Sequence, residues 1–468
     1  MTNTVEKLRP RFRGALLRPG QEGYDQARRV WNGAIDRRPA LVARCADADD
    51  VAEAVRFARG RDLPVSVRGG GHAVAGHAVV EDGLMIDLSL MNAVAVDPVA
   101  RTATAGGGTL LGDLDRATQG FGLATTAGIV SETGIGGLTL GGGLGHLMRK
   151  HGLTVDNLLS VDLVTAEGEK VRVDGATDPE LFWGIRGGGG NFGIATAFRY
   201  RLHPVGPLVL AGPIVWPLKQ AGEVLRFLRD FAPQAPDALG IALSARMAPP
   251  APFMPPERVG ETVLIVMPVW AGDVAEGLKV LAPLRRLGTP IADAVRPTPY
   301  LAVQSLMDAG NPRGMHYYWR SQRLPDLNDD VIDAVASQAG AIEAPLSYVA
   351  GLTVGGAVTR VHPDATAVGP RGDGFELNIV AGWRPEDAAP ERHVAWVRKG
   401  WEALRPHSAG VFSHFLSDEG EAGVEAAYGK RLRRLRALKD RHDPTNLFRM
   451  NANIAPSREP ARGERNGG

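Results

Sequence analysis

The stretch "VRGGGHAVAGHA", residues 67–78, places an arginine and three consecutive glycines before a histidine, and a second histidine follows five residues later. A run of glycines lets the backbone take positive φ angles and lets a ligand approach the peptide groups closely. Residues 63–67, LPVSV, precede the glycines and have the pattern of a short strand. The sequence therefore predicts a strand followed by a ligand-binding loop in which His72 is the reactive side chain.

The composition of the chain limits which ligands and partners this loop could bind. The chain has 468 residues, too many for one ordinary core, so two packed units are expected. Cys45 is the single cysteine, which leaves no internal disulfide or cysteine metal cluster; we predict a small buried residue there and no metal site. The formal net charge is +1, which argues against a nucleic-acid partner. No apolar run has the length of a signal peptide or a membrane span, so we expect a soluble, cytoplasmic protein with no membrane partner.

The glycines are concentrated in four clusters within the first two hundred residues. These are RGGGH (68–72), GGG (106–108), GIGGLTLGGGLG (134–145) and RGGGGNFG (186–193). Well-patterned apolar segments bound each cluster, which a low-complexity linker would not show. We therefore interpret the clusters as loops of one ligand site.

One cluster also matches the dinucleotide pattern G-x-G-x-x-G, through Gly188, Gly190 and Gly193. That motif requires a strand before it and an acidic residue about twenty positions later. The preceding residues, DPELFWGIRG, have a helical pattern, and the acidic residue is missing. We therefore reject a Rossmann-type turn, although glycine-rich loops can still bind phosphates through backbone N–H groups.

The expected strands and helices predict an α+β fold with three consecutive parts. Residues 1–205 mix short strands and hairpins with helices over 50–60 and about 109–121. In residues 206–410, strand patterns at 208–216, 239–246, 262–270, 348–354 and 375–383 alternate with helical patterns near 219–232, 273–287, 328–342 and 386–404. This order is typical of an antiparallel sheet with helices on one face. From about residue 410 we expect a strand, GVFSHFLS, and a long helix over 420–441 that ends before Pro444.

Six separated segments carry a resemblance to a known family. In chain order they are VRGGGHAVAGHA, DGLMIDLSLMN, GIGGLTLGGGLG, KHGLTVDNL, LFWGIRGGGGNFGI and YGKRLRRLRALKDRHDPTNLFRMNANI. From about residue 30 to 456 the chain resembles a berberine bridge enzyme-like FAD-linked oxidase, of the vanillyl-alcohol oxidase or PCMH-type superfamily. The resemblance implies an FAD-binding domain made of residues 1–205 and 411–468, with a substrate-binding domain at 206–410.

The resemblance also implies an activity. Hydride transfer from a small or medium alcohol, amine or sugar-like substrate would reduce a bound FAD, and oxygen as acceptor would give hydrogen peroxide. Two alternatives stay open: a flavin-dependent dehydrogenase or tailoring enzyme of secondary metabolism, and a flavin-binding module with little turnover.

The loop histidine has a specific role in this family. The resemblance implies that His72 is bonded to the 8α carbon of the flavin, which requires a neutral imidazole. Arg68 would favour that neutral form by like-charge repulsion and, with the loop amides, would bind the diphosphate. A hydrogen-bonded loop histidine is the alternative for His72, and His77 is expected to hydrogen-bond backbone near the cofactor. Many members have a second link through a cysteine; Val130 stands at that position, so the chain resembles members with the histidyl bond alone.

Further cofactor contacts follow by position. Thr133 stands where the family often has a small apolar residue that gates oxygen. Asn157 and Ile194 would contact the adenosine side or the ring edge, and Asn451 and Asn453 would return to the flavin from the chain end, unless they form a capped turn. The glycines expected at the cofactor are Gly69, Gly70, Gly71, Gly76, Gly128, Gly134, Gly137, Gly141, Gly142 and Gly145.

Three residues are candidates for the catalytic base. Tyr428 matches a tyrosine that some bacterial members use, and it would need a cationic or hydrogen-bonding neighbour to act near neutral pH. His414 alternates with Phe412 and Leu416 on the predicted strand, so it should face the same side as they do. Tyr348, at the start of another strand, is the third candidate. A core position is the alternative for both Tyr428 and His414.

Overall fold

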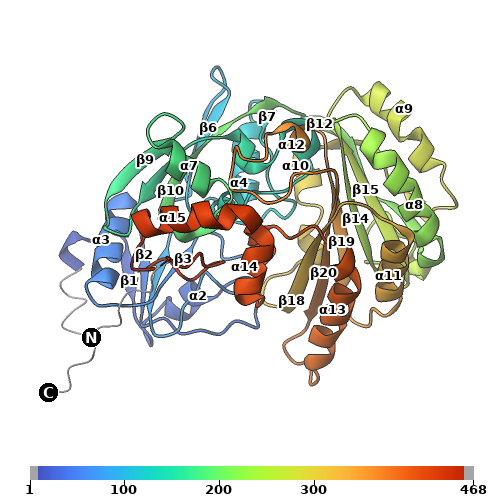
Figure 1. Cartoon of the computed structure of the whole chain (residues 1–468). Helices are drawn as coiled ribbons and strands as arrows, with labels where there is room; N and C mark the ends of the chain where they lie inside the picture. Colours follow the sequence, from blue (N-terminus) through green and yellow to red (C-terminus); the bar gives the residue numbers. More distant parts are fainter. Residues whose placement is uncertain (1–8, 458–468) are drawn as a thin grey trace.

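The computed structural model describes residues 9–457, and these residues form an α+β fold, as predicted (Figure 1). Their strands are grouped in four sheets. The predicted domains extend to residues 1 and 468, of which residues 1–8 and 458–468 lie outside the described part. Within the described part, no helix is long and apolar enough to cross a membrane.

Two sheets in the first half of the chain share one core. The four-stranded sheet has the order β1 (Ala15–Leu17), β2 (Leu41–Arg44), β4 (Leu84–Asp87), β3 (Val65–Arg68), and its last three strands are parallel. The antiparallel five-stranded sheet has the order β5 (Val94–Asp97), β6 (Thr102–Gly106), β10 (Ile194–Arg201), β8 (Leu158–Val164), β9 (Lys170–Asp174). Side chains of both sheets pack with α3 (Ala48–Arg59) in one cluster, which includes the buried Cys45. The predicted strand before the glycine loop is therefore confirmed, and the β5–β6 and β8–β9 pairs are hairpins of the kind expected in this part of the chain.

Short elements complete this half and carry the glycine clusters. They are α2 (Tyr24–Arg28), α4 (Leu111–Gln119), α5 (Ile135–Leu140), α6 (Met148–His151), α7 (Pro179–Ile185) and the two-stranded sheet of β7 (Leu123–Ala124) with β11 (His203–Pro204). A helix, α7, precedes the G-x-G-x-x-G match of the fourth cluster, and Asp178 caps it by accepting a hydrogen bond from Leu181 N. The rejection of a Rossmann turn is thereby confirmed, because that turn follows a strand.

A nine-stranded sheet dominates the second half of the chain. Its main path is β16 (Ala292–Asp293), β13 (Ile214–Pro217), β15 (Thr262–Trp270), β14 (Leu239–Met247), β19 (Tyr348–Val354), β20 (Gly374–Trp383), β18 (His316–Leu324); β12 (Leu208–Ala211) pairs with β15 and with β17 (Arg296–Pro299). All of its described pairings are antiparallel. The predicted strands 262–270 and 348–354 are confirmed at their bounds.

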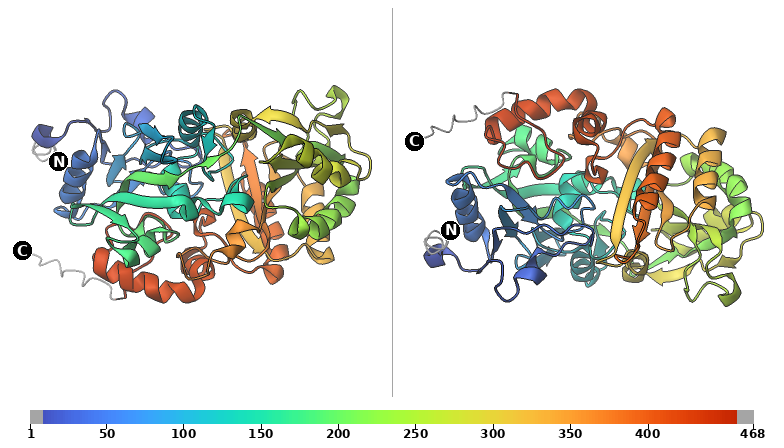
Figure 2. Two further views of the ribbon diagram at one scale, coloured as in Figure 1. Left: turned by 90° about the horizontal axis from the view of Figure 1, so that it is seen from above. Right: turned by 90° about the horizontal axis from the view of Figure 1, so that it is seen from below.

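The two faces of the large sheet have different neighbours. One face packs in a single core against α8 (Ala221–Phe231), α9 (Val274–Arg285), α11 (Asp329–Gly340) and α13 (Glu391–Leu404). The opposite face turns toward the first half of the chain, so the sheet lies between its helices and the smaller sheets (Figure 2). Two short helices, α10 (Tyr300–Gln304) and α12 (Ala357–Arg360), lie outside this layer. Helices on one face of an antiparallel sheet are what the pattern predicts.

The chain end returns to the first half. The last helices, α14 (Gly420–Tyr428) and α15 (Leu432–His442), pack their apolar side chains into the core of the five-stranded sheet. In Figure 1, α15 runs beside α7, an element more than two hundred residues earlier in the chain. Both ends of the chain therefore build the same half of the molecule.

Two predictions near the chain end are wrong. The segment GVFSHFLS is not a strand: Ser413–Phe415 is a 3-10 helix, because the Ser413 hydroxyl and the His414 ring bond to carbonyls of glycine loops rather than to a sheet. The helix over 420–441 is interrupted at Gly429, whose φ of 50° a helix does not allow. His414 therefore does not share a strand face with Phe412 and Leu416.

Two strands of the large sheet were also misjudged. The stretch predicted as one strand over 208–216 is two strands, β12 and β13, separated at Gly212 with a φ of 156°. Strand β18 was not predicted, although its aromatic residues Tyr317 and Trp319 alternate as strand residues do. The aromatic Tyr318 between them and the polar and basic residues at 320–323 hid the pattern.

Candidate flavin site and substrate cavity

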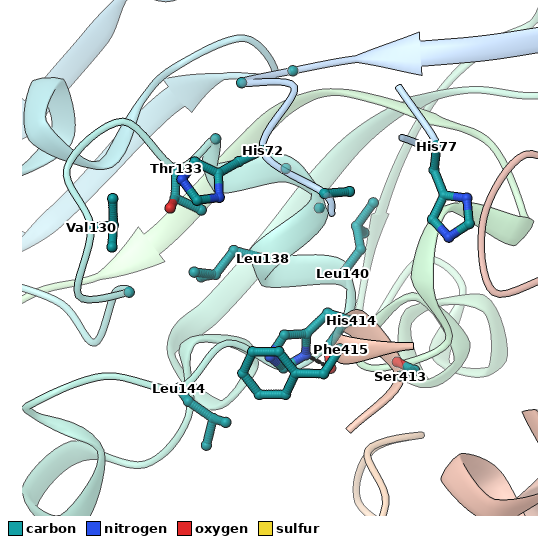
Figure 3. Close-up of a pocket in the computed structure, with 18 of the residues that line it drawn as sticks. His72, His77, Val130, Thr133, Leu138, Leu140, Leu144, Ser413, His414 and Phe415 are labelled. Carbon is teal, nitrogen blue, oxygen red and sulfur yellow. Dashed lines mark hydrogen bonds between the residues drawn. The ribbon is translucent and has the colours of Figure 1, made fainter. Parts of the chain in front are cut away.

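A cavity of about 420 Å³ lies between the glycine loops and the free face of the large sheet. Figure 3 shows the wall formed by the glycine loops, with His72, Thr133 and His414. Segments from 65–73, 128–144, 189–195, 413–416 and 448–452 contribute to its wall, together with strands β14, β15, β18, β19 and β20. The predicted residues that line it are His72, Gly69, Gly70, Gly71, His77, Gly128, Val130, Thr133, Gly134, Gly137, Gly141, Ile194, Asn451, Tyr348, His414 and Tyr428. The structure thus brings together loops that are far apart in the sequence.

His72 follows β3 and its glycine loop, in which Gly71 has a φ of 68°. Its ring stacks on Trp31 with 4.3 Å between ring centroids, and Trp31 stacks in turn on Tyr317 at 4.0 Å. The buried Nε2 atom has no hydrogen-bond partner among the described residues. Burial, together with a smaller effect of the charge of Arg313, lowers the pKa of His72 to about 4. The imidazole is therefore neutral at pH 7, with one nitrogen free to bond to another group.

Arg68 is not the charge that disfavours the protonated form of His72, contrary to our prediction. It is outside the cavity wall, donates a hydrogen bond to Ala27 O, and lies 3.9 Å from Asp87. The cation that disfavours a charged His72 is Arg313, more than two hundred residues further along the chain. Similarly, the ring of His77 lines the cavity but makes no backbone hydrogen bond within the described residues.

Asn157 also serves the fold instead of the cavity. Its Nδ2 donates hydrogen bonds to His151 O at 2.9 Å and Leu153 O at 3.0 Å, and its Oδ1 lies 2.6 Å from His203 Nε2. These contacts hold the turn before β8, and Asn157 is not among the residues that line the cavity.

Four further predicted residues are absent from the wall: Gly76, Gly142, Gly145 and Asn453. Gly76 and Gly142 have φ angles of 69° and 122°, which explains glycine at both positions. A Cβ at Gly145 would lie 1.5 Å from Ala127 O, so this glycine allows two backbone segments to touch. Close packing and backbone conformation therefore account for these glycines, which sequence patterns alone could not separate from ligand contacts.

The wall of the cavity nevertheless fits a large planar cofactor. A Cβ at Gly137 would meet no atom within 4 Å, so the cavity is open beside this residue. Opposite loops approach each other through bare backbone, since a Cβ at Gly70 would lie 2.4 Å from Gly134 N. Buried polar atoms without partners face this region, among them His72 Nε2 and Asn451 Oδ1. Glycine walls and unpaired polar atoms are what a bound FAD would complete.

A buried network connects the chain end to these loops. Lys439 Nζ donates hydrogen bonds to Asp443 Oδ2 at 2.7 Å, Asn191 O at 2.9 Å and Phe448 O at 3.0 Å. Asn191 Nδ2 in turn donates to Gly188 O at 2.8 Å and Ala452 O at 3.1 Å. These bonds hold the segment that includes Asn451 in the cavity wall.

The candidate bases His414 and Tyr428 both reach the cavity from the returning chain end. The Nδ1 of His414 lies 3.1 Å from Gly141 O, and since a carbonyl only accepts, Nδ1 carries the proton and Nε2 has the free lone pair. Burial lowers the pKa of His414 to about 4. Burial raises the pKa of Tyr428 to about 12, against a smaller opposing effect of Ser413. Tyr428 therefore lacks the cationic neighbour that a tyrosine base needs.

The free face of the large sheet supplies residues that the sequence analysis missed. Arg246 and Tyr348 are directly opposite each other on β14 and β19, and Ser244 is opposite Ala350 one row away. Asn378, on β20, is opposite Ala350 on the other side. The signal was present: Leu239, Ile241, Leu243 and Ala245 face the helices, so Ser244 and Arg246 had to face the other side.

Comparisons with known proteins agree with this site. A family model described as "FAD binding domain" matches residues 39–174, and one described as "Berberine and berberine like" matches residues 417–455. The chain is 32% identical to a FAD-linked oxidoreductase of Dictyostelium discoideum, over 97% of each chain. It is 31% identical to (R)-6-hydroxynicotine oxidase of Paenarthrobacter nicotinovorans, over 95% of this chain and 97% of the relative.

Solved structures give the same assignment. That of 6-hydroxy-D-nicotine oxidase from Arthrobacter nicotinovorans matches with a TM-score of 0.85 and 29% identity, over 95% of this chain and 98% of the other. The xylooligosaccharide oxidase of Myceliophthora thermophila shares the fold, with a TM-score of 0.86 and 22% identity over 97% and 99% of the two chains. The family models cover both ends of the chain, and full-length relatives exceed 30% identity. The chain therefore belongs to the berberine bridge enzyme-like family of FAD-linked oxidoreductases.

Proposed function

We propose that this enzyme holds FAD covalently through His72 and oxidises a small or medium alcohol, amine or sugar-like substrate, with oxygen as acceptor and hydrogen peroxide as product. The observation that carries the proposal is the cavity itself, with the unpartnered His72 Nε2 in its glycine wall and a sheet face opposite. Bound FAD would supply the hydride acceptor. Val130 cannot form a thioether, so His72 is the attachment point.

His414 is the proposed base. Its Nε2 has the free lone pair, because Nδ1–H donates to Gly141 O. No Asp or Glu lines the cavity in the described part of the chain, so a carboxylate base is not at hand. The phenols of Tyr428 and Tyr348, with pKa values raised to about 12, are protonated at neutral pH. The Tyr348 hydroxyl already donates to Asn311 Oδ1, so the Tyr428 hydroxyl, which has no partner among the described residues, donates the hydrogen bond that orients the substrate oxygen. The proton of the substrate moves to His414 Nε2.

Flavin fluorescence of the denatured protein in a gel tests the attachment. We expect a fluorescent wild-type band that His72→Ala loses and His77→Ala keeps; His77 is the matched control because it also lines the cavity and its pKa is also lowered to about 4 by burial. A dark wild-type band from a yellow protein would refute the covalent bond. A protein that takes up no flavin would refute the proposed function.

A second measurement separates the oxidase from the alternatives. The flavin is reduced by light without oxygen and then mixed with aerated buffer. Fast return of the visible flavin absorbance is expected for an oxidase. Slow reoxidation, with rapid reduction by a substrate, would favour the dehydrogenase or tailoring enzyme, and no reduction by any substrate would favour a flavin-binding module.

A further inference from the structure

Arg246 is the single Asp, Glu, Lys or Arg side chain in the cavity wall, among the residues that the structure describes. No ion pair or side-chain hydrogen bond joins its guanidinium to another described residue, and its Nε is buried without a partner. Burial lowers its pKa, and the groups that act against this are the phenols of Tyr348 and Tyr317. An enclosed cation without an acidic partner is costly, so such a group implies an anion that the chain itself does not supply.

The guanidinium is held in one place. Its Cζ lies 5.3 Å from the ring centroid of Tyr348, and a Cβ at Gly310 would come within 2.7 Å of its Nη1, so the backbone closes that side. The Tyr348 hydroxyl donates a 2.6 Å hydrogen bond to Asn311 Oδ1, which fixes the ring in turn. Arg246 is thus positioned before a ligand arrives, which reduces the entropy lost on binding.

The neighbouring residues indicate the size and chemistry of the ligand. Arg246, Tyr348 and Val380 form one row across the sheet, and Ser244, Ala350 and Asn378 form the next. The atoms Ser244 Oγ and Asn378 Oδ1 are buried without partners. The cavity wall has a single cation, and the rest of the wall is mostly apolar with a few polar atoms. This arrangement fits a small organic molecule that bears one carboxylate. A planar guanidinium binds a carboxylate through two parallel hydrogen bonds.

We propose that Arg246 binds a carboxylate of the substrate, so that the enzyme oxidises a hydroxy acid or another alcohol that bears a carboxylate. This inference rests on the proposed function, since it assigns the substrate class of the same cavity. An amine with a free ammonium group would be repelled by Arg246, which favours the alcohol among the three substrate classes.

The test uses unreactive probes on the purified FAD-containing protein. Acetate, benzoate and phenylacetate are titrated against their uncharged amides, and binding is followed by the change in the visible flavin spectrum. At least one carboxylate should bind about 10- to 100-fold more tightly than its amide. Arg246→Gln should abolish that preference and Arg246→Lys should keep part of it, while Arg296→Gln, which removes an exposed guanidinium of the same sheet, should not change it.

Other results would overturn the inference. These are equal binding of acid and amide, no carboxylate binding, or a preference that persists in Arg246→Gln. A flavin spectrum that changes in Arg246→Gln before any probe is added, with no change in carboxylate affinity, would assign Arg246 to the cofactor instead. If the purified chain lacks flavin, the proposed function fails. Binding of the same probes is then followed by the fluorescence of Trp319 in the cavity wall. Failure of the proposed function and failure of the carboxylate inference are therefore distinguishable.

Discussion

At the scale of single residues, burial acts in opposite directions on the two kinds of ionisable side chain in the cavity. It lowers the pKa of His72 and His414 to about 4 and raises the pKa of Tyr348 and Tyr428 to about 12. The cause is the same, since loss of water disfavours whichever form is charged. At neutral pH each histidine is therefore a neutral imidazole with one acceptor nitrogen, and each tyrosine keeps the proton of its hydroxyl.

The role of His414 predicts a separation between catalysis and cofactor binding. Asparagine places an N–H donor where His414 has Nδ1, so His414→Asn keeps the hydrogen bond to Gly141 O but removes the Nε2 lone pair. We expect kcat to fall by about 10²- to 10⁴-fold with unchanged flavin content, as for loss of a general base. Steady-state oxidation and in-gel flavin fluorescence measure the two properties.

His414→Gln is the matched variant, because glutamine can extend an acceptor toward the position of Nε2. A kcat in His414→Asn within two-fold of the wild type would show that another group takes the proton. A larger loss in Tyr428→Phe than in His414→Asn would identify the phenol as that group.

At the scale of elements, the helix α5 contains residues that destabilise a helix. It contains Gly136 and Gly137 within six residues. Glycine inside a helix costs about 0.5–1 kcal/mol relative to alanine. The space beside Gly137 explains this choice, because an added Cβ there would point into the cavity.

A larger side chain at Gly137 should therefore impair cofactor binding without preventing folding. Gly137→Leu should lower the flavin content of the purified protein several-fold, because the side chain takes space that the cofactor needs, while the flavin-free chain still folds. Visible absorbance per protein and thermal unfolding measure the two effects. The control is Gly372→Leu, at an exposed glycine that also has no atom within 4 Å of an added Cβ. Full flavin content in Gly137→Leu would show that the cofactor lies elsewhere.

The helix α15 depends on a buried ion pair. Lys439 and Asp443 are fully buried, and Asp443 also accepts hydrogen bonds from Leu447 N and Phe448 N. Lys439→Met leaves that carboxylate buried without its cation, so the free energy of unfolding should fall by about 3–5 kcal/mol. Urea unfolding measures this, and Lys430→Met, at an exposed position, should have little effect. An unchanged midpoint in Lys439→Met would contradict the argument.

At the scale of the whole molecule, several buried histidines connect stability to pH. Burial lowers the pKa of His146 from 6.5 to about 4, and neither of its ring nitrogens has a partner in the described structure. As pH falls through 6.5 the unfolded chain binds a proton, whereas the folded chain binds it only near pH 4. The contribution of His146 to the free energy of unfolding is therefore present above pH 6.5 and is lost as pH falls toward 4. Burial raises the pKa values of Asp115 and Glu376 to about 7. Their contribution to the free energy of unfolding is therefore present at low pH and is lost as pH rises toward 7.

Replacement of His146, which does not line the cavity, tests how one buried histidine changes stability with pH. The Tm of the wild type should be lower at about pH 5 than at about pH 7, and His146→Leu should reduce that difference because one depressed pKa is removed. Thermal unfolding at both pH values measures it, with His362→Gln as the exposed control. An equal pH dependence in His146→Leu and wild type would mean that His146 has the same pKa in the folded and unfolded chain.

Local patterns in the sequence determined the fold class, the helix α3, the strands β15 and β19, the glycine loops and the candidate His72. These features depend on contacts between near neighbours, which periodicity and glycine position report directly. The tertiary structure alone decided which side chains share the cavity. It replaced Arg68 by Arg313 as the cation near His72, turned GVFSHFLS into a 3-10 helix on the glycine loops, and set Arg246 opposite them. Each of these outcomes depends on segments hundreds of residues apart, whose contacts leave no periodic signal in either segment.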